Sequence, residues 1–179
     1  GTKVAVQGRE NYTEPPDINI YIVDLNTGKT ERISHLDVNE ESPEWFSNSN
    51  KIAYTSFDPS SGLTVHIYDV DTDREIQTIK EAGYIHLAVS PDETLIFNPV
   101  LARLYDVDTG KLVADLKDKI LTALQDNDYT PDTRFHGQAN LGTFPMDADF
   151  SPDGKHIVFD GAVEKNGKYG LIMFSMTIS

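Results

Sequence analysis

One segment of the chain gathers side chains that could act on a small molecule. Arg134 and His136 lie in the run Arg-Phe-His-Gly-Gln, and Asp147 and Asp149 follow after a short interval. A histidine can serve as a base, an arginine can hold an anion, and two carboxylates can hold a cation. We therefore take Arg134, His136, Asp147 and Asp149 as candidate ligand-binding residues. The competing interpretation is a loop with a purely structural role.

Aspartates cluster at alternate positions in three places, a pattern that suggests calcium. The clusters lie at 69–73, 106–108 and 147–153. Hard cations prefer carboxylate oxygens, but none of these runs has the spacing of glycine and glutamate that a calcium loop requires. The first two clusters follow apolar strands, where aspartate bonds the backbone of a tight turn. We therefore predict turn chemistry, with no metal and no other cofactor.

The sequence lacks the motifs that signal catalysis. It contains no Gly-x-Ser-x-Gly elbow, no Gly-x-Gly-x-x-Gly and no P-loop, and its histidines show no metal-binding spacing. We expect His66 and His156, which fall in predicted strands, to be structural. Cysteine is absent, which excludes disulfides and thiol catalysis. No residue is assigned as catalytic.

The charge of the chain limits its partners. Lys and Arg number 15 against 29 Asp and Glu, which gives a formal net charge of -14. Binding to nucleic acid depends on clustered Lys and Arg, so a nucleic-acid partner is excluded. No apolar run approaches the roughly 18 residues of a membrane span. A basic protein or a metal cation would fit the acidic surface, and solubility alone would also explain it.

Two short cues alternate along the chain and define its elements. One cue ends a strand with an aspartate-led turn and occurs at 24–29, 69–74 and 106–111. The other opens a strand from a serine and occurs at 47–51, 90–94 and 151–155. Both cues suit tight hairpins, because glycine accepts positive φ and aspartate bonds the turn backbone. Together they predict a four-strand meander that recurs about every 40 residues, as in a β-propeller blade.

The predicted fold class is therefore all-β: a β-propeller segment of about four four-stranded antiparallel blades, two complete and two partial. The blade-like units lie at about 1–36, 37–80, 81–117 and 145–179. The first unit lacks its first strand and the last lacks its fourth. Each unit is a small sheet that cannot bury its own faces. We expect the segment to belong to a larger ring, completed by another chain or by a missing segment.

The segment 118–144 interrupts the repeats. Apolar residues at helical spacing over 116–124 predict one short helix, and the rest reads as a polar loop without strands. Meander geometry places the tight turns at one end of each blade and the remaining connections at the other. These remaining connections form what we call the long-loop face, made of 8–17, 35–42, 58–63, 117–145 and 161–168. Rigid scaffolds commonly present function on such loops.

Three stretches resemble a known family. Pro-Glu-Trp-Phe-Ser at 43–47, Asp-Phe-Ser-Pro-Asp-Gly-Lys-His-Ile-Val-Phe at 149–159 and Ile-Tyr-Ile-Val-Asp at 20–24 resemble the blades of TolB-type β-propellers, the WD40-like repeat group. The third unit is about as similar to seven-bladed propellers with Tyr-Val-Thr-Asn-like repeats. The resemblance covers nearly the whole chain except 117–145. The chain departs from the pattern at Asp73, which replaces a turn glycine, and at Asn48 and Asn50, which replace Pro and Gly.

The resemblance implies a scaffold outside the cytoplasm, periplasmic or secreted, because most members are bacterial or archaeal proteins found there or domains attached to peptidases. We predict a non-enzymatic TolB-like platform whose long-loop face binds a protein partner or a small ligand. One alternative is the propeller of a metal-dependent lyase with its site within 134–149. Another is an accessory propeller domain of a serine peptidase.

Overall fold

The structure, a computed structural model, describes residues 1–9, 18–33, 36–60, 62–80, 86–132 and 147–178. The chain divides into two compact units, Gly1–Tyr84 and Ile85–Ser179, and each is described by itself. Both units are built from antiparallel sheets whose neighbouring strands are mostly neighbours in the sequence. This arrangement confirms the predicted all-β fold class of a partial propeller.

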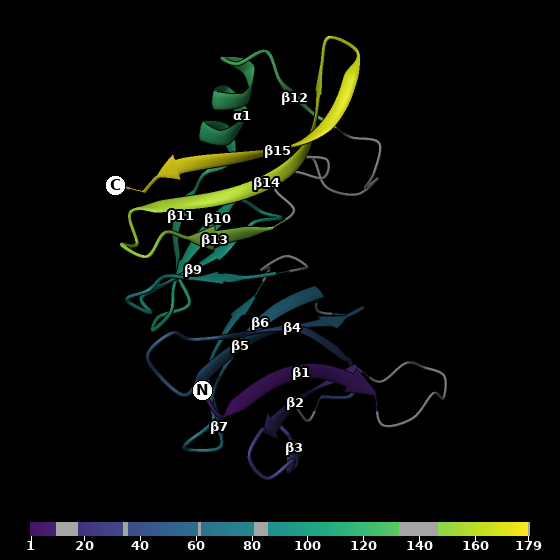
Figure 1. The fold of residues 1–179 in the computed structure, drawn as a ribbon, viewed down its shortest axis with the longest axis vertical. Helices are drawn as coiled ribbons and strands as arrows, with labels where there is room; N and C mark the ends of the chain where they lie inside the picture. The colour runs from purple at the N-terminus through teal and green to yellow at the C-terminus, as the bar shows by residue number, and fades with distance from the viewer. Residues whose placement is uncertain (10–17, 34–35, 61, 81–85, 133–146, 179) are drawn as a thin grey trace. The chain divides into compact units, whose positions relative to one another are not determined.

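The first unit contains two meander sheets (Figure 1). The N-terminal sheet has the order β1-β2-β3, with β1 (Lys3–Arg9), β2 (Ile18–Asp24) and β3 (Thr30–Arg32). The second sheet has the order β4-β5-β6-β7, with β4 (Asn39–Trp45), β5 (Lys51–Asp58), β6 (Gly62–Asp69) and β7 (Arg74–Lys80). Because β5 and β6 pair without a register shift over their whole length, alternate side chains of both strands share one face.

An apolar core joins these two sheets. Ile20 and Ile22 on β2 lie in one buried cluster with Tyr54 on β5 and Tyr68 on β6. Since successive strand residues face opposite sides, the residues between them, such as Tyr21, face away from the second sheet. The β-branched and aromatic residues of these strands thus form an inner face that only a neighbouring sheet can cover.

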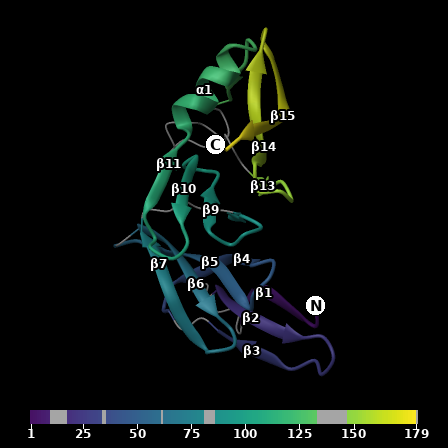
Figure 2. The ribbon, with the colours of Figure 1, turned by 90° about the vertical axis from the view of Figure 1, so that its left-hand side faces the viewer.

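The second unit also contains two sheets, and a helix lies beside the last of them (Figure 2). The third sheet has the order β11-β10-β9-β8, with β8 (Ala88–Val89), β9 (Leu95–Asn98), β10 (Arg103–Asp106) and β11 (Leu112–Asp115). In the fourth sheet β14 (His156–Lys165) pairs with β15 (Lys168–Thr177) along one edge, and with β13 (Ala148–Phe150) and β12 (Thr130–Pro131) along the other. The helix α1 (Lys117–Gln125) confirms the short helix predicted over 116–124.

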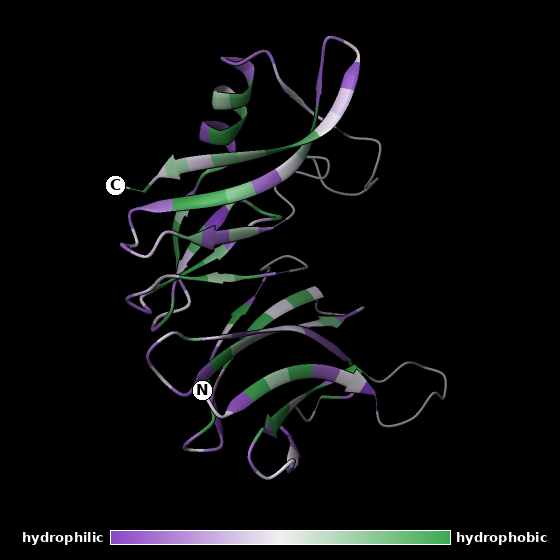
Figure 3. Cartoon of the chain, in the orientation of Figure 1, coloured by the Kyte–Doolittle hydropathy of each residue, from purple (hydrophilic) through white to green (hydrophobic). Residues whose placement is uncertain are grey.

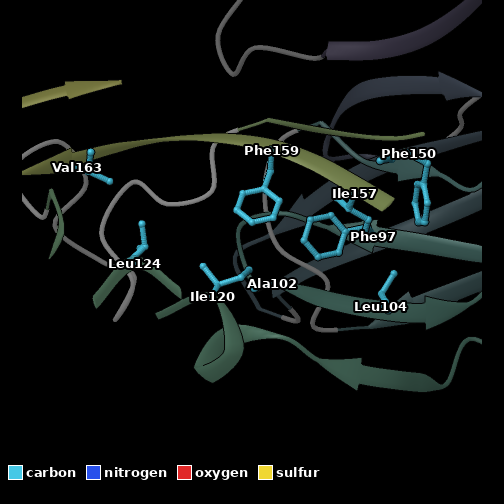
Figure 4. Close-up of a cluster of buried hydrophobic side chains, with 10 residues drawn as sticks. Phe97, Ala102, Leu104, Ile120, Leu124, Phe150, Ile157, Phe159 and Val163 are labelled. Atoms are coloured by element: carbon cyan, nitrogen blue, oxygen red, sulfur yellow. The ribbon is translucent and has the colours of Figure 1, made fainter. Parts of the chain in front are cut away.

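The core of the second unit is an aliphatic and aromatic cluster that links the third sheet, the fourth sheet and α1 (Figure 4). Phe97 on β9 is fully buried among side chains that include Phe159 on β14. Ile120 and Leu124 of α1 complete the cluster. Figure 3 shows the same division along the chain, with hydrophobic residues concentrated in the strands and hydrophilic residues in the turns.

The structure corrects three expectations about connections. The segment 118–144 was expected to hold no strand, but β12 lies in it and gives the last sheet a fourth strand on the β13 side. The stretch 161–168, expected as a long loop, is a continuation of β14 and β15 that closes at Asn166 and Gly167. The stretch 58–63 likewise holds the ends of β5 and β6. Turn residues are present in both stretches, Asn166-Gly167 in one and Asp58-Pro59 with Gly62 in the other, and they mark the hairpins that the loop interpretation overlooked.

The aspartate-led turns work as predicted. The carboxylate of Asp106 accepts hydrogen bonds from the backbone N–H of Thr109 at 2.8 Å and from its hydroxyl at 2.6 Å. Gly110 takes a φ of +66°, which other residues rarely adopt. Asp24 forms the same bonds with Thr27. In the remaining turn Asp73 itself adopts a φ of +55°, which its short polar side chain tolerates.

Two of the serine-led turns, at 90–94 and 151–155, share one pattern. The hydroxyl of Ser151 donates to the Asp153 carboxylate at 2.6 Å and accepts the backbone N–H that opens β14 at 2.9 Å. Ser90 makes the equivalent bonds with Asp92 and with the first residue of β9. The acidic clusters at these turns are therefore bonded to their own backbone and hydroxyl groups, as the turn interpretation predicted.

The turn carboxylates make the stability of the fold depend on pH. The Thr109 hydroxyl lowers the pKa of Asp106, and donors within their own turns lower the pKa values of Asp24, Asp92 and Asp153. A carboxyl whose pKa is lower in the folded state stabilises the fold above its unfolded pKa. That stabilisation is lost as the pH falls through the folded pKa.

We expect Asp106→Ala to lower the free energy of unfolding at neutral pH, as measured by urea denaturation. The variant should lose less stability than the wild type between about pH 5 and about pH 2, because it lacks one carboxyl whose pKa is lowered. Asp108→Ala, in the same turn, is the matched control. An equal loss of acid-dependent stability in both variants would contradict the role given to Asp106.

The contribution of the aromatic core of the second unit to stability can be tested by mutation. Phe97→Ala removes a fully buried ring and leaves a cavity, and we expect it to cost about 3–5 kcal/mol of unfolding free energy. Leu112→Ala, at an exposed position on β11, should change that free energy by less than about 0.5 kcal/mol. Urea denaturation followed by circular dichroism measures both values. Similar costs for the two variants would show that Phe97 does not anchor the core.

Candidate functional site

The structure describes two of the four predicted ligand-binding residues. Arg134 and His136 fall outside the described residues, while Asp147 and Asp149 are exposed at the start of the fourth sheet. Asp149 lies on β13 and Asp147 directly precedes that strand, so the two alternate positions face the same side of the sheet. Asp160 lies opposite Asp147, and its carboxylate accepts the Asp147 N–H at 3.0 Å. The face therefore carries three carboxylates close to the beginning of β13.

Both predicted carboxylates bond to nearby backbone. The Asp147 carboxylate accepts the N–H of Ala148 at 2.9 Å, and the Asp149 carboxylate accepts the N–H of Phe150 at 2.7 Å. Each uses one oxygen in these bonds, so each retains capacity to accept from a ligand. Within the residues that the structure describes, no group of three His, Asp or Glu side chains has the geometry to hold a metal ion.

The segment before this site is anchored to the fourth sheet. The N–H of Asp132 donates to the carbonyl of Ala162 at 2.9 Å and continues the short β12 pairing. Lys165 donates to the carbonyl of Asn127 at 2.7 Å, and its ammonium lies 4.6 Å from the centre of the Tyr129 ring. The predicted insertion thus begins with a helix and a short strand that contact the fourth sheet.

A polar hollow of about 450 Å³ lies at the tight-turn end of the second sheet, within the first unit. Its lining includes Ser49, Lys51 and Asp69, and the amide of Asn50 donates to both carboxylate oxygens of Asp71 at 3.0 and 2.9 Å. These turns were expected to have only a structural role. In the sequence, the hint of this hollow was the pair of asparagines at 48 and 50, where the TolB-type repeats that the chain resembles have Pro and Gly.

A second arrangement that the sequence did not reveal is a chain of hydrogen bonds across the second sheet. The Ser56 hydroxyl lies 2.7 Å from Nε2 of His66, and Nδ1 of His66 lies 2.5 Å from the Glu75 carboxylate. A carboxylate only accepts, so Nδ1 carries a proton, and in the neutral ring Nε2 accepts the serine hydroxyl. The Tyr54 ring stacks on the imidazole with centroids 4.9 Å apart.

This order of groups is the one found in serine hydrolases, but its position argues for a structural role. Ser56 and His66 are each only 6% exposed, so a substrate carbonyl cannot approach the hydroxyl. The fully buried Glu40 lies opposite Ser56 in the strand register. Burial, followed by the charges of Glu40 and Glu75, raises the pKa of Tyr54. The bonds hold β5, β6 and β7 together and confirm the structural role expected for His66.

Among the residues that the structure describes, no helix is both long and apolar enough to cross a membrane. Scans against models of known protein families and against curated proteins give no match to this chain. Its likeness to other proteins therefore rests on solved structures.

Several solved structures are similar in fold. TolB from Acinetobacter baumannii aligns with a TM-score of 0.58 and 18% identity, over 94% of this chain and 40% of TolB. An oligogalacturonate lyase in complex with manganese aligns with a TM-score of 0.61 and 16% identity, over 99% of this chain and 46% of the lyase. A chain of the mitotic checkpoint complex aligns with a TM-score of 0.58 and 14% identity, over 90% of this chain and 43% of its own length.

These identities show a shared fold alone, and this chain spans less than half the length of each of those chains. The likeness to TolB and other propeller proteins supports the architecture that the repeated turns predicted. The chain thus has the fold of part of a β-propeller.

Proposed function

We propose that this chain is a non-enzymatic, TolB-like propeller segment of a larger ring outside the cytoplasm, and that its long-loop face binds a protein partner or a small ligand. The observation that supports this proposal is that the side chains capable of catalysis are held in structural hydrogen bonds. The turn aspartates bond their own turns, and Ser56 and His66 are buried in a sheet. What remains for function is surface shape and charge.

The contact residues in this proposal are Arg134, His136, Asp147 and Asp149. Asp147 and Asp149 are exposed, and each keeps an oxygen that makes no bond to its neighbouring N–H. The net charge of -14 favours a partner that carries Lys or Arg at its contact surface. Such a contact works through charge complementarity and requires no chemical step.

A metal-dependent lyase is the second candidate. Asp147, Asp149 and Asp160 lie on one sheet face but do not by themselves have the geometry of a metal site, so this candidate requires His136 as a further ligand. The fold is shared with an oligogalacturonate lyase that binds manganese, although that likeness extends to fold only. Carboxylates and imidazole are suitable ligands for manganese.

Binding to the long-loop face can be tested with a basic probe. We expect a fluorescein-labelled octalysine peptide to bind the chain in fluorescence anisotropy. The double variant Asp147→Asn with Asp149→Asn should weaken that binding about threefold, as expected for two exposed charge contacts. The double variant Asp71→Asn with Asp108→Asn removes two charges at the tight-turn end and serves as the control. Equal weakening by both pairs would show general charge attraction and contradict the interface assignment.

Titration with manganese separates the two candidates. If the chain is a non-enzymatic platform, isothermal titration with Mn²⁺ should show no saturable site at micromolar concentration, because exposed carboxylates bind a hydrated divalent ion weakly. Saturable binding that is lost in His136→Ala, and retained in the control His156→Ala, would favour the lyase. That result would overturn the non-enzymatic proposal.

A further inference from the structure

The serine-led turn of the second sheet, at 47–51, departs from the pattern of the other two turns. In those turns an aspartate accepts the hydroxyl of the leading serine, as Asp153 does for Ser151 at 2.6 Å. The second sheet has Ser49 in place of that aspartate. Within the part of the chain that the structure describes, the Ser49 hydroxyl is shielded from solvent and has no hydrogen-bond partner. Such a hydroxyl is costly, so the turn pattern gives no structural reason for this serine.

The polar hollow of about 450 Å³ is lined by residues of this turn and of the aspartate-led turn at 69–74. Two contacts hold the turns together. The Asn50 amide donates to the Asp71 carboxylate, and the Val70 N–H donates to the Asn50 carbonyl at 2.9 Å. Every lining residue belongs to the first unit. The volume falls within the roughly 300–1,000 Å³ of small-molecule pockets.

Two opposite charges of the lining are neighbours without forming an ion pair. Lys51 pairs with Asp69 in the register of β5 and β6, so the two side chains share one face. Among the described residues Lys51 makes no ion pair, and its ammonium lies 5.8 Å from the centre of the Phe46 ring. One Asp69 oxygen accepts the N–H groups of Asp71 and Thr72 at 2.9 and 3.1 Å, and the other retains its capacity to accept. A hydroxyl placed between Lys51 and Asp69 can accept from the ammonium and donate to the carboxylate.

The mixture of charges in the lining decides the class of ligand. The carboxylates of Asp69 and Asp71 repel an anion such as phosphate, and the Lys51 ammonium repels a metal cation. The other lining side chains are serine hydroxyls and asparagine amides, which both donate and accept. An apolar ligand would bury these groups without bonding them. A neutral molecule with several hydroxyls matches the lining, because each hydroxyl also donates and accepts.

We propose that this hollow binds a saccharide unit, with one sugar hydroxyl between Lys51 and Asp69 and another bonded to Ser49. Ser49 lines the hollow, and rotation about its Cα–Cβ bond directs the hydroxyl toward the sugar. The Asn50 amide is held on Asp71, so its side-chain oxygen accepts from a third hydroxyl. Because the two turns are already bonded together, binding requires little ordering of the chain. The inference goes beyond the proposed function, because it involves no residue of the long-loop face.

Titration followed by NMR of the whole 179-residue chain tests this site. Three neutral probes are added separately to isotope-labelled protein: the methyl α-glycosides of glucose, galactose and mannose. At least one should shift the amide signals of 47–51 and 69–71 in a saturable way. The expected dissociation constant is about 1–10 mM, since a few exposed hydrogen bonds bind weakly. The signals of the third and fourth sheets should stay in place.

Substitutions separate sugar binding from turn structure. Lys51→Met removes the ammonium and keeps the length of the side chain, and Asp69→Asn keeps an oxygen for the turn N–H groups. Each should raise the dissociation constant about fivefold or more, because each removes a charged partner of the sugar hydroxyl. Ser49→Ala should act in the same direction with a smaller effect. Lys155→Met and Asp106→Asn, at the equivalent positions of other turns, are the matched controls and should leave the dissociation constant unchanged.

The same amide spectra report whether each variant remains folded. The absence of a saturable shift with all three probes at about 50 mM would overturn the inference. Equal weakening by the controls, or a stronger response to inorganic phosphate than to any of the sugars, would overturn it as well. Either result leaves the proposed contact at Asp147 and Asp149 standing, since those residues belong to the other unit.

Discussion

A single small sheet of this chain cannot bury its own apolar faces, and the rest of the structure depends on that constraint. A sheet of three or four short strands shields no apolar side chain by itself, so neighbouring sheets must cover its faces. Ile20 and Ile22 are buried in one cluster with Tyr54 and Tyr68 of the second sheet. Phe97 is buried in one cluster with Phe159 of β14 and with side chains of α1. The hydrophobic effect thus acts between blades more than within them.

The same constraint decides where the polar side chains go. Short strands require many tight turns, and each turn leaves backbone N–H groups that need acceptors. The aspartates and serines of the turns supply those acceptors, and this accounts for much of the clustered acid in the sequence. Where polar groups lie inside, as with Ser56 and His66, they bond one another across strands. Acid and hydroxyl groups are therefore poor guides to catalysis in this chain.

The turns made the fold predictable from the sequence, because each cue combines residues that only a tight turn requires. The order of the strands and the helix over 116–124 followed from such local patterns. The hydrogen-bond chain of Ser56, His66 and Glu75 did not, because it depends on the register of three strands and on a bulge at Ile67 and Tyr68. The β12 strand was missed since two residues carry no periodicity. Of the predicted site, the structure places the two aspartates, and Arg134 and His136 stay predictions.

A shared fold says little about function in this architecture, because a TolB protein, a lyase and a checkpoint complex all contain sheets arranged like these. What distinguishes such proteins is the surface that each ring exposes. In this chain the buried sheet faces follow the repeat pattern of a propeller. The residues that carry information about function are therefore those that this repeat does not require. Ser49 belongs to that group, since the other two serine-led turns have an aspartate at its position. Asp147 and Asp149 also belong to it, because they lie outside the recurring turns and still carry charge to the surface.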